Sequence, residues 1–486
     1  MATFHVENFG CRATQADGAA LERQFESRGL ARATTQEADL VILNTCTVTN
    51  SADQDARAAI RRVRRNNPKA KIIVTGCYAQ RAPEAIAAMP GVEAVVGNSH
   101  KHELARLVLQ NVLAPEPEGK FGNLLPISVL TEKWQGAVAN SIFVSDIFAH
   151  TELLAAPVFE SGNPHSGDRT RPNLKVQDGC NNRCSFCVIP SVRGKSRSLP
   201  LESVIAEVNT LVSAGYKELV ISGINLGRWG RDLVWGVRPR APKGATSDIP
   251  QTLVDLVRAI LAETDLEKLR ISSVEPMDWT DDLISLVASL PRIAKHAHIP
   301  LQSGSDAVLR RMQRRYRPWH YREKIEKIRA AMPMAAIGAD VMVGFPGESD
   351  TEFECTRQLI EELPFTYLHV FTYSPRPGTS AATMPKQVPV HVARERNKIL
   401  RDLATEKKHA FMRSFVGRRL DAITLSGAYD TPHSEYTEAL TDNYQKLYLR
   451  GRLASNHWIA AQITAVHDDV LHGVPAGVRL PTTLAV

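Results

Sequence analysis

Residues 1–112 alternate short apolar runs with stretches of helical periodicity. The apolar runs are ATFHVENF, ADLVILN, KIIVTG and VEAVVG, and helical patterns cover about Ala16 to Ser27 and Ser51 to Asn66. Strands that alternate with helices in this way predict a parallel sheet with helices packed on its faces. We therefore expect an open α/β sheet in this part of the chain.

The same alternation returns six times between Asn173 and about Tyr373. The predicted strands are NLKVQD, ELVISGI, KLRISSV, KHAHIPL, AAIGADVMVG and FTYLHVFTY. Helical patterns lie between them, for example at Leu201–Ala214, Leu253–Glu263, Asp281–Leu290 and Thr351–Leu363. In repeated β/α units of a barrel the active site lies where the strands end, so polar residues at these ends are candidates for chemistry.

Two further segments complete the organisation. Residues 113–171 are rich in Pro, Gly and Ser near both ends and read as a linker or insertion. A long helical pattern ends near Gly417 and is followed by short strand-like runs. We expect four parts, at residues 1–112, 113–171, 172–416 and 417–486, the last being a small β domain.

Charge and composition narrow the class of protein. The chain has 486 residues and a net charge of +7. It shows no apolar stretch long enough to span a membrane and no signal-like start, so we expect a cytoplasmic location. Seven cysteines, an odd number, argue against a secreted disulfide framework. Basic runs at Arg57–Lys71 and Arg310–Arg317 indicate either a polyanion partner or solvated helix faces.

The most specific motif is a C-x3-C-x2-C run formed by Cys180, Cys184 and Cys187. Three thiolates can hold an iron–sulfur cube, which normally takes four, and the fourth iron then stays open to a ligand. The alternatives are a zinc site and a disulfide pair. A zinc site needs a fourth ligand, and the next His or Cys in the sequence is His296. The motif therefore favours a cluster.

Three other cysteines each follow a predicted strand. Cys11, Cys46 and Cys77 come after the first, second and third strands of the N-terminal sheet. The carboxyl ends of strands in an open α/β sheet form one ligand-binding edge. We therefore expect these thiols to meet and hold a second cluster, the alternative being three unrelated buried cysteines.

These motifs resemble those of the methylthiotransferase family of radical S-adenosylmethionine (SAM) enzymes. The resemblance rests on FGCRATQ, NTCTVTN, TGCYAQ and CNNRCSFC, including Phe186, and it extends almost to the end of the chain. Thr14 departs from the family, where Asn is more common. The resemblance implies a partial (β/α) barrel in the centre and a small C-terminal β-barrel, called TRAM, that helps to hold tRNA or acts as a structural cap.

The resemblance also implies the cofactors and their ligands. Cys180, Cys184 and Cys187 would hold the [4Fe-4S] cluster that binds SAM, whose reductive cleavage gives a 5′-deoxyadenosyl radical. Cys11, Cys46 and Cys77 would hold an auxiliary [4Fe-4S] cluster that carries the inserted sulfur. The expected SAM-binding residues are Phe186 and residues at successive strand ends, namely Gly223, Asn225, Ser273, Glu275, Gln302 and Asp340.

Other residues are open to two interpretations. Arg193, Lys195 and Arg197 could meet SAM, RNA phosphate or only solvent. Tyr316, Trp319 and Tyr321 lie among arginines, which suits stacking on RNA bases or an ordinary helix with packed aromatics. Cys355 fits neither cysteine set and is expected to pack inside a helix bundle.

The sequence most resembles the branch that acts on N6-threonylcarbamoyladenosine at position 37 of tRNA. The expected partners are tRNA and a one-electron donor such as flavodoxin or ferredoxin. The alternatives are an isopentenyladenosine tRNA or a ribosomal-protein aspartate as substrate, a radical SAM methylase without sulfur insertion, and a non-catalytic iron–sulfur protein that binds RNA.

Overall fold

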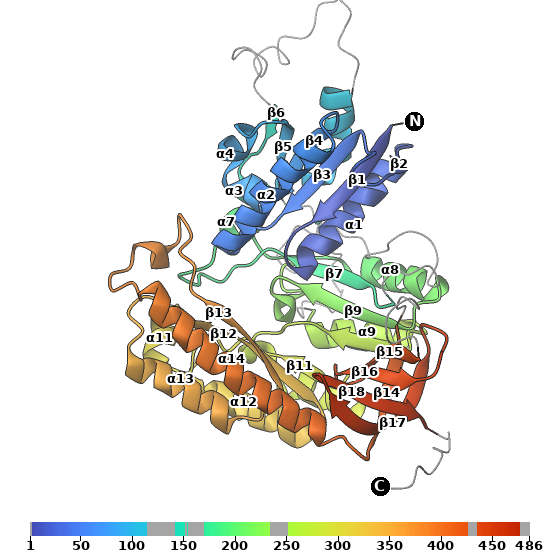
Figure 1. Ribbon diagram of the computed structural model, residues 1–486, viewed down its shortest axis with the longest axis vertical. Coiled ribbons are helices and arrows are strands. Elements are labelled where there is room, and N and C mark those ends of the chain that lie inside the picture. Colours follow the sequence, from blue (N-terminus) through green and yellow to red (C-terminus); the bar gives the residue numbers. More distant parts are fainter. Residues whose placement is uncertain are drawn as a thin grey trace, which may run out of the picture. The chain divides into compact units, whose positions relative to one another are not determined.

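A computed structural model describes residues 2–113, 141–150, 153, 170–233, 251–425 and 435–476 (Figure 1). The chain forms two compact units. The first contains Met1–Leu154 and also Val188–Lys195, and the second contains Ala155–Cys187 and Ser196–Val486. We describe each unit by itself.

The first unit is built on a six-stranded parallel sheet with the order β2-β1-β3-β4-β5-β6. The predicted strands are all present. The strands of this sheet are β1 (Thr3–Asn8), β2 (Ala31–Arg32), β3 (Leu40–Thr45), β4 (Lys71–Gly76), β5 (Val92–Gly97) and β6 (Ser141–Phe143). The helices are α1 (Arg12–Glu26), α2 (Asn50–Asn66), α3 (Cys77–Arg81), α4 (Pro83–Ala87), α5 (Leu104–Val108) and α7 (Ile189–Arg193), with short turns η1 (Lys101–Glu103), η2 (Leu109–Leu113) and η3 (Ile147–Ala149).

Apolar residues cover both faces of this sheet. Leu40 and Ile42 of β3 belong to one cluster together with Phe25 of α1. Val41 of β3 belongs to a second cluster with Ile60 of α2. Because neighbouring residues of a strand point to opposite faces, a strand buried on both sides must be apolar throughout. This explains why ADLVILN reads as a continuous run rather than an alternating one.

The segment predicted as a linker contributes to the same sheet. Ser141–Phe143 form β6, which pairs in parallel with β5. Residues 113, 144–150, 153, 170 and 171 of this segment are also described, and the others lie outside the described residues. Its apolar stretch thus supplies an edge strand, which the surrounding loop-like composition concealed.

The second unit contains the predicted six-unit partial barrel. Its parallel strands are β7 (Asn173–Asp178), β9 (Glu218–Gly223), β10 (Lys268–Ile271), β11 (His296–His298), β12 (Ala336–Val343) and β13 (Tyr367–Thr372). Bridges at Leu269–Ile293 and Ser273–His298 connect β10 to β11, so the strands form one curved wall. The two-residue β8 (Arg197–Ser198) pairs antiparallel with β7.

Helices pack on one side of this wall (Figure 1). They are α8 (Leu201–Ser213), α9 (Leu253–Glu263), α10 (Asp281–Ser289), α11 (Asp306–Arg311), α12 (Pro318–Ala331), α13 (Asp350–Glu362) and the long α14 (Val390–Arg413), with turns η4 (Leu226–Arg228), η5 (Pro276–Asp278) and η6 (Ser380–Thr383). The four helices predicted between strands agree with α8, α9, α10 and α13 to within a residue. None of the described helices is long and apolar enough to cross a bilayer.

The chain after α14 forms a closed five-stranded barrel with the order β14-β15-β16-β18-β17. Its strands are β14 (Arg419–Thr424), β15 (Tyr436–Thr441), β16 (Lys446–Arg450), β17 (Trp458–His467) and β18 (Val470–Pro475). They lie in the region where the sequence predicted short strand-like runs. Closure leaves no exposed sheet edge, so the small β domain is confirmed as a barrel.

Arg270 of β10 links this barrel to the wall of strands. Its side chain is 1% exposed, and Nε donates to Oε1 of the buried Glu218 at 2.7 Å. Nη1 donates to the carbonyl of Asp442 in the barrel at 3.0 Å, and the guanidinium lies 5.3 Å from the ring centre of Tyr444. The buried Arg270 guanidinium therefore donates hydrogen bonds both within the wall of strands and to the barrel.

We expect Arg270→Leu to lower the free energy of unfolding by about 3–5 kcal/mol, because it leaves Glu218 buried without its closest cation. Arg258→Leu, on the exposed face of α9, is the matched control and should change stability by less than about 0.5 kcal/mol. Urea unfolding followed by tryptophan fluorescence measures both. Equal effects of the two substitutions would show that the buried contact has no special weight.

Candidate functional site

Cys180, Cys184 and Cys187 lie in the loop that leaves the carboxyl end of β7. All seven cysteines belong to the described residues, and none forms a disulfide bond. Gln177 holds the start of this loop: its Nε2 donates to the carbonyls of Asp178 and Gly179, each at 2.9 Å. Its Oε1 accepts from the backbone N–H of Asn225 at 2.7 Å. The loop is thereby fixed to the turn that follows β9.

Two side chains from other strands and loops donate to these sulfurs. Asn225 Nδ2 lies 3.6 Å from Cys180 Sγ, and Arg314 Nη1 lies 3.3 Å from Cys184 Sγ. Arg314 also forms an ion pair with Glu275, and its Nε donates to the Tyr316 hydroxyl at 3.2 Å. Donors at sulfur stabilise thiolate, which is the form that binds metal.

Burial shifts the pKa of two side chains in this region, Cys180 and Glu275. Burial raises the pKa of the Cys180 thiol, against the hydrogen bonds from Asn182 and Asn225. Burial also raises the pKa of Glu275, partly offset by the neighbouring Arg314. A carboxyl group shifted in this way beside a cleft is a common feature of functional sites.

A cleft opens beside Cys184. Its lining includes Arg183, Arg228, Arg314 and Arg315, with Glu275 as the carboxylate among them. Four guanidinium groups against one carboxylate favour an anionic group in the cleft.

The other predicted SAM-binding residues divide between two places. Phe186 packs edge-on against Phe345, with ring centres 6.4 Å apart, and Gly223 ends β9. Gln302 and Asp340 lie together on the β11–β12 part of the wall, where Gln302 N donates to the carbonyl of Asp340 at 2.8 Å. Asp340 is inside β12 and not at its end.

Contacts among the described residues tie Asn225 and Glu275 to the first cysteine set. None of the described contacts ties Gln302 or Asp340 to it. Ser273 follows β10 and forms the bridge to His298.

The aromatic residues among the arginines are mostly core residues. Tyr316 and Tyr321 are 1% and 0% exposed. Their hydroxyls donate to the carbonyls of Leu301 at 2.7 Å and Ile299 at 2.8 Å. Stacking of these two rings on RNA is therefore wrong, and the alternative of packed aromatics is right for them. Trp319, at 55% exposed, stays accessible.

The second cysteine set gathers at the carboxyl edge of the first unit's sheet. Cys11 is the N-cap of α1, Cys46 directly follows β3, and Cys77 begins α3 directly after β4. Burial, and then the nearby thiolates of Cys77 and Cys11, raise the pKa of Cys46 to about 12. The three thiols therefore lie close enough to influence one another, as the sequence predicted.

Glycines make this close approach possible. Gly10 and Gly76 precede Cys11 and Cys77, with φ of +105° and +100°. A Cβ at Gly10 would lie 2.9 Å from Cys46 Sγ, and one at Gly76 would overlap the Thr45 carbonyl and lie 2.6 Å from Thr45 N. Both positions need the left-handed conformation and the absence of a side chain.

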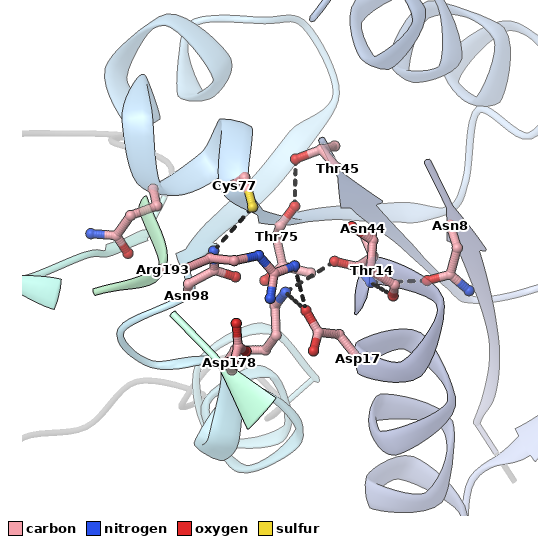
Figure 2. A network of polar contacts seen from close by, with 12 residues as sticks. Asn8, Thr14, Asp17, Asn44, Thr45, Thr75, Cys77, Asn98, Asp178 and Arg193 are labelled. Carbon is pink, nitrogen blue, oxygen red and sulfur yellow. Dashed lines mark hydrogen bonds and ion pairs between the residues drawn. The ribbon is translucent and has the colours of Figure 1, made fainter. Parts of the chain in front are cut away.

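Figure 2 shows the polar groups around Cys77. Asn98 Nδ2 lies 3.5 Å from Cys77 Sγ and also donates to the carbonyl of Val192 at 2.8 Å. Nearby, Asn44 Nδ2 donates to Asn8 Oδ1 at 2.9 Å and to the carbonyl of Thr14 at 2.7 Å. Thr14 accepts this hydrogen bond through its backbone carbonyl and not through its side chain.

A buried group of charges lies in the same unit. Lys101 Nζ and Arg193 Nη2 each lie 3.0 Å from Asp17 Oδ2, and all three side chains are almost completely buried. Burial lowers the pKa of Lys101, against Asp17. The two cations exceed the one carboxylate, and Arg193 partly opposes the rise in the pKa of Cys46. Arg193 is therefore not a solvated loop residue.

The thiols of neither cysteine set are gathered as closely as the donors of a single metal ion. Two thiolates on one zinc ion lie roughly 3.8 Å apart, given tetrahedral bonds of about 2.3 Å. Among the described residues, a group of three with every ligand atom within 4.8 Å is found at His298, Asp340 and His369, and neither cysteine set is drawn so close together. Three thiol donors at wider spacing suit an iron–sulfur cube.

Two surface features complete the description. Cys355 is exposed on α13, so the expectation that it packs inside a helix bundle is wrong. The basic run of the first unit lies on α2, where Arg57, Arg61, Arg62, Arg64 and Arg65 are exposed.

Sequence reasoning missed several of these residues. Arg314 was placed in a basic run, although it lies 130 positions from the Cys184 sulfur that it contacts. Asn98, Asp17 and Lys101 carry no local signal, because their roles depend on partners from other elements.

Two family models match the chain. The description of the first is "Uncharacterized protein family UPF0004", over residues 3–97, and the second is "Radical SAM superfamily", over residues 174–360. The chain is 35% identical over 452 residues to the threonylcarbamoyladenosine tRNA methylthiotransferase MtaB of Bacillus subtilis (strain 168), covering 93% of this chain and 91% of that protein. The corresponding protein of Rickettsia prowazekii (strain Madrid E) is 35% identical and covers 96% of each chain.

A relative whose name states another substrate is nearly as similar. The tRNA-2-methylthio-N(6)-dimethylallyladenosine synthase of Novosphingobium aromaticivorans is 34% identical, covering 87% of this chain and 86% of that one. Among solved structures, the radical SAM methyltransferase TsrM from Kitasatospora setae has a similar fold, with a TM-score of 0.51 and 14% identity, over 78% of this chain and 75% of that one.

We expect Gly76→Ala to destabilise the first unit and to reduce the iron bound per chain, because a Cβ there meets the Thr45 backbone. Gly29→Ala is the matched control, since Gly29 has φ of +82° but nothing within 4 Å of an added Cβ. The control should show only the cost of strain, about 1–3 kcal/mol, with full iron content. Urea unfolding and iron analysis measure both, and equal iron loss in the two variants would contradict the close-approach argument.

Proposed function

The chain belongs to the radical SAM methylthiotransferase family, and we propose that it adds a methylthio group to C2 of N6-threonylcarbamoyladenosine 37 in tRNA. The observation that carries this proposal is the presence of two separate sets of three cysteines, each at the carboxyl edge of parallel strands. One set suits SAM chemistry, and a methylase without sulfur insertion would not need the other.

Two [4Fe-4S] clusters and SAM are the cofactors. Cys180, Cys184 and Cys187 would hold one cluster, and Cys11, Cys46 and Cys77 the other. When bound, these groups would pass the donor's electron to SAM, and would supply the radical that activates C2, the sulfur that is inserted and, from a second SAM, its methyl group.

The chain's own residues prepare the first site. Asn225 and Arg314 donate to the sulfurs of Cys180 and Cys184 and so orient them for metal binding. Glu275 keeps Arg314 in place through their ion pair. The arginines of the adjoining cleft offer charge to a carboxylate, such as that of SAM. Phe186 packs against Phe345 and closes the apolar side of the loop.

We further propose how the partners engage. The exposed arginines of α2 offer a positive face to the phosphate backbone of tRNA. The electron comes from a small carrier such as flavodoxin or ferredoxin, and the reaction takes place in the cytoplasm, where tRNA is modified.

Single cysteine substitutions should separate the two sites. Cys184→Ala is expected to abolish release of 5′-deoxyadenosine from SAM, because the first set loses a ligand. Cys77→Ala should still release it but form no methylthio product, because sulfur insertion depends on the second set. Product analysis by mass spectrometry under reducing, anaerobic conditions measures both.

Cys355→Ala is the matched control for these variants, because Cys355 is exposed and belongs to neither set. It should behave as the unsubstituted protein. Retained SAM cleavage in Cys184→Ala would rule out the assignment of the first set.

Nucleoside mass spectrometry of bulk tRNA from cells with and without this gene tests the substrate. We expect the methylthio group to disappear from threonylcarbamoyladenosine and to return when the gene is restored. Loss from isopentenyladenosine instead would keep the chemistry and change the substrate. No change in any tRNA nucleoside would point to the ribosomal protein or to a non-catalytic role.

A further inference from the structure

Methylthiotransferases that act on adenosine 37 must distinguish chemically different N6 substituents. The threonylcarbamoyl group carries a carboxylate, a hydroxyl and N–H groups, whereas the dimethylallyl group is a hydrocarbon. A site that selects the first must therefore contain donors for a carboxylate and an acceptor for a hydroxyl or N–H. The partial barrel contains one such combination.

Three polar residues on neighbouring strands supply it. His298 ends β11, Asp340 lies in β12 and His369 lies in β13, where Asp340 and His369 are directly paired. One nitrogen or oxygen from each of the three lies within 4.8 Å of the others. The imidazole rings of His298 and His369 are stacked, with centres 5.5 Å apart and planes at 18°.

These side chains occupy the face of the wall opposite the helices. Ile337, Ala339 and Val341 of β12 are fully buried in the apolar core. Asp340 alternates with them and is only partly buried, and His369 is exposed. Because neighbouring residues of a strand point to opposite faces, the three polar side chains lie on the inner side of the wall, away from the apolar core.

A chain of hydrogen bonds fixes His298 in position. Its Nδ1 lies 3.3 Å from the hydroxyl of Tyr367, and that hydroxyl lies 2.7 Å from His296 Nε2. The Tyr367 ring sits where Gly338 has no side chain, since a Cβ at Gly338 would overlap it. The tyrosine thereby sets which ring nitrogen of His298 faces the inner side.

His298 Nε2, the ring nitrogen nearest to Asp340, is not fully hydrogen-bonded. His298 Nε2 is buried and lies 3.2 Å from Asp340 Oδ1, but it makes no hydrogen bond of good geometry within the described residues. A buried polar atom in this state costs free energy unless a ligand or water completes it. A hydrocarbon substituent could not form a hydrogen bond with this nitrogen. A site built to hydrogen-bond its substrate strongly rejects an analogue that lacks the polar group.

We propose that His298, Asp340 and His369 bind the threonylcarbamoyl substituent of the target adenosine, an assignment that rests on the proposed function. The imidazole N–H groups of His298 and His369 donate to the substituent's carboxylate. Asp340 accepts from its hydroxyl or N–H. This places Asp340 on the substrate rather than on SAM, in agreement with its position inside β12.

The test measures discrimination at position 37. Anaerobic holoenzyme is titrated with anticodon stem-loops that are identical except for threonylcarbamoyladenosine, isopentenyladenosine or adenosine at that position, and fluorescence anisotropy gives each Kd. The ratio of Kd values for adenosine and threonylcarbamoyladenosine is the readout, because a general folding defect weakens both and leaves the ratio unchanged. His369→Leu should reduce this ratio by about 10-fold to 100-fold, the usual weight of a hydrogen bond to a charged group.

Two further variants sharpen the result. His369→Gln keeps one N–H donor and should show an intermediate ratio. His391→Leu, on the exposed side of α14, is the matched control and should keep the ratio of the unsubstituted protein.

Three outcomes would overturn the inference. An unchanged ratio in His369→Leu, with threonylcarbamoyladenosine still methylthiolated by the unsubstituted protein, would reject the site and leave the proposed function standing. Failure of the unsubstituted protein both to discriminate and to methylthiolate that nucleoside would reject both. The same side chains are a donor set for a divalent cation, so a stoichiometric metal other than cluster iron, lost in His369→Leu, would replace direct recognition by a metal site.

Discussion

The common direction of parallel strands is the constraint on which the chemistry of this chain depends. In a parallel sheet all carboxyl ends face one edge, so residues that are far apart in sequence meet there. Cys11, Cys46 and Cys77 come together in this way, each in the turn or cap that leaves a strand. The turns tolerate this crowding only because Gly10 and Gly76 have positive φ and no side chain.

Each unit that carries a cysteine set also contains buried ion pairs. Asp17 with Lys101 and Arg193, and Glu275 with Arg314, are ion pairs largely removed from water. Such pairs add little net stability, since the loss of hydration offsets their attraction. Their value is positional and electrostatic. Glu275 holds Arg314 against the Cys184 sulfur, and Asp17 holds Lys101 and Arg193 within the unit that carries the second cysteine set.

In the partial barrel, alternate residues of a strand face either the apolar core or the inner side. Residues of β12 that face the helices are apolar and fully buried, whereas Asp340, which lies between them, faces inward beside His298 and His369. The contacts described place Asn225 and Glu275 beside the cysteines, and Gln302 and Asp340 on the β11–β12 part of the wall. One curved sheet thus offers two chemically distinct regions.

The sequence by itself determined the order of strands and helices, the two sets of cysteines and the small C-terminal barrel, because local periodicity and motif spacing are recorded along the chain. It did not reveal β6, since a short edge strand in Pro- and Gly-rich surroundings has no clear pattern. It left the roles of Tyr316 and Tyr321 open and misread Cys355, because burial depends on partners distant in sequence. Only the tertiary structure could bring Arg314 to Cys184, Lys101 to Asp17 and His369 to His298, because these contacts exist only after strands and helices pack.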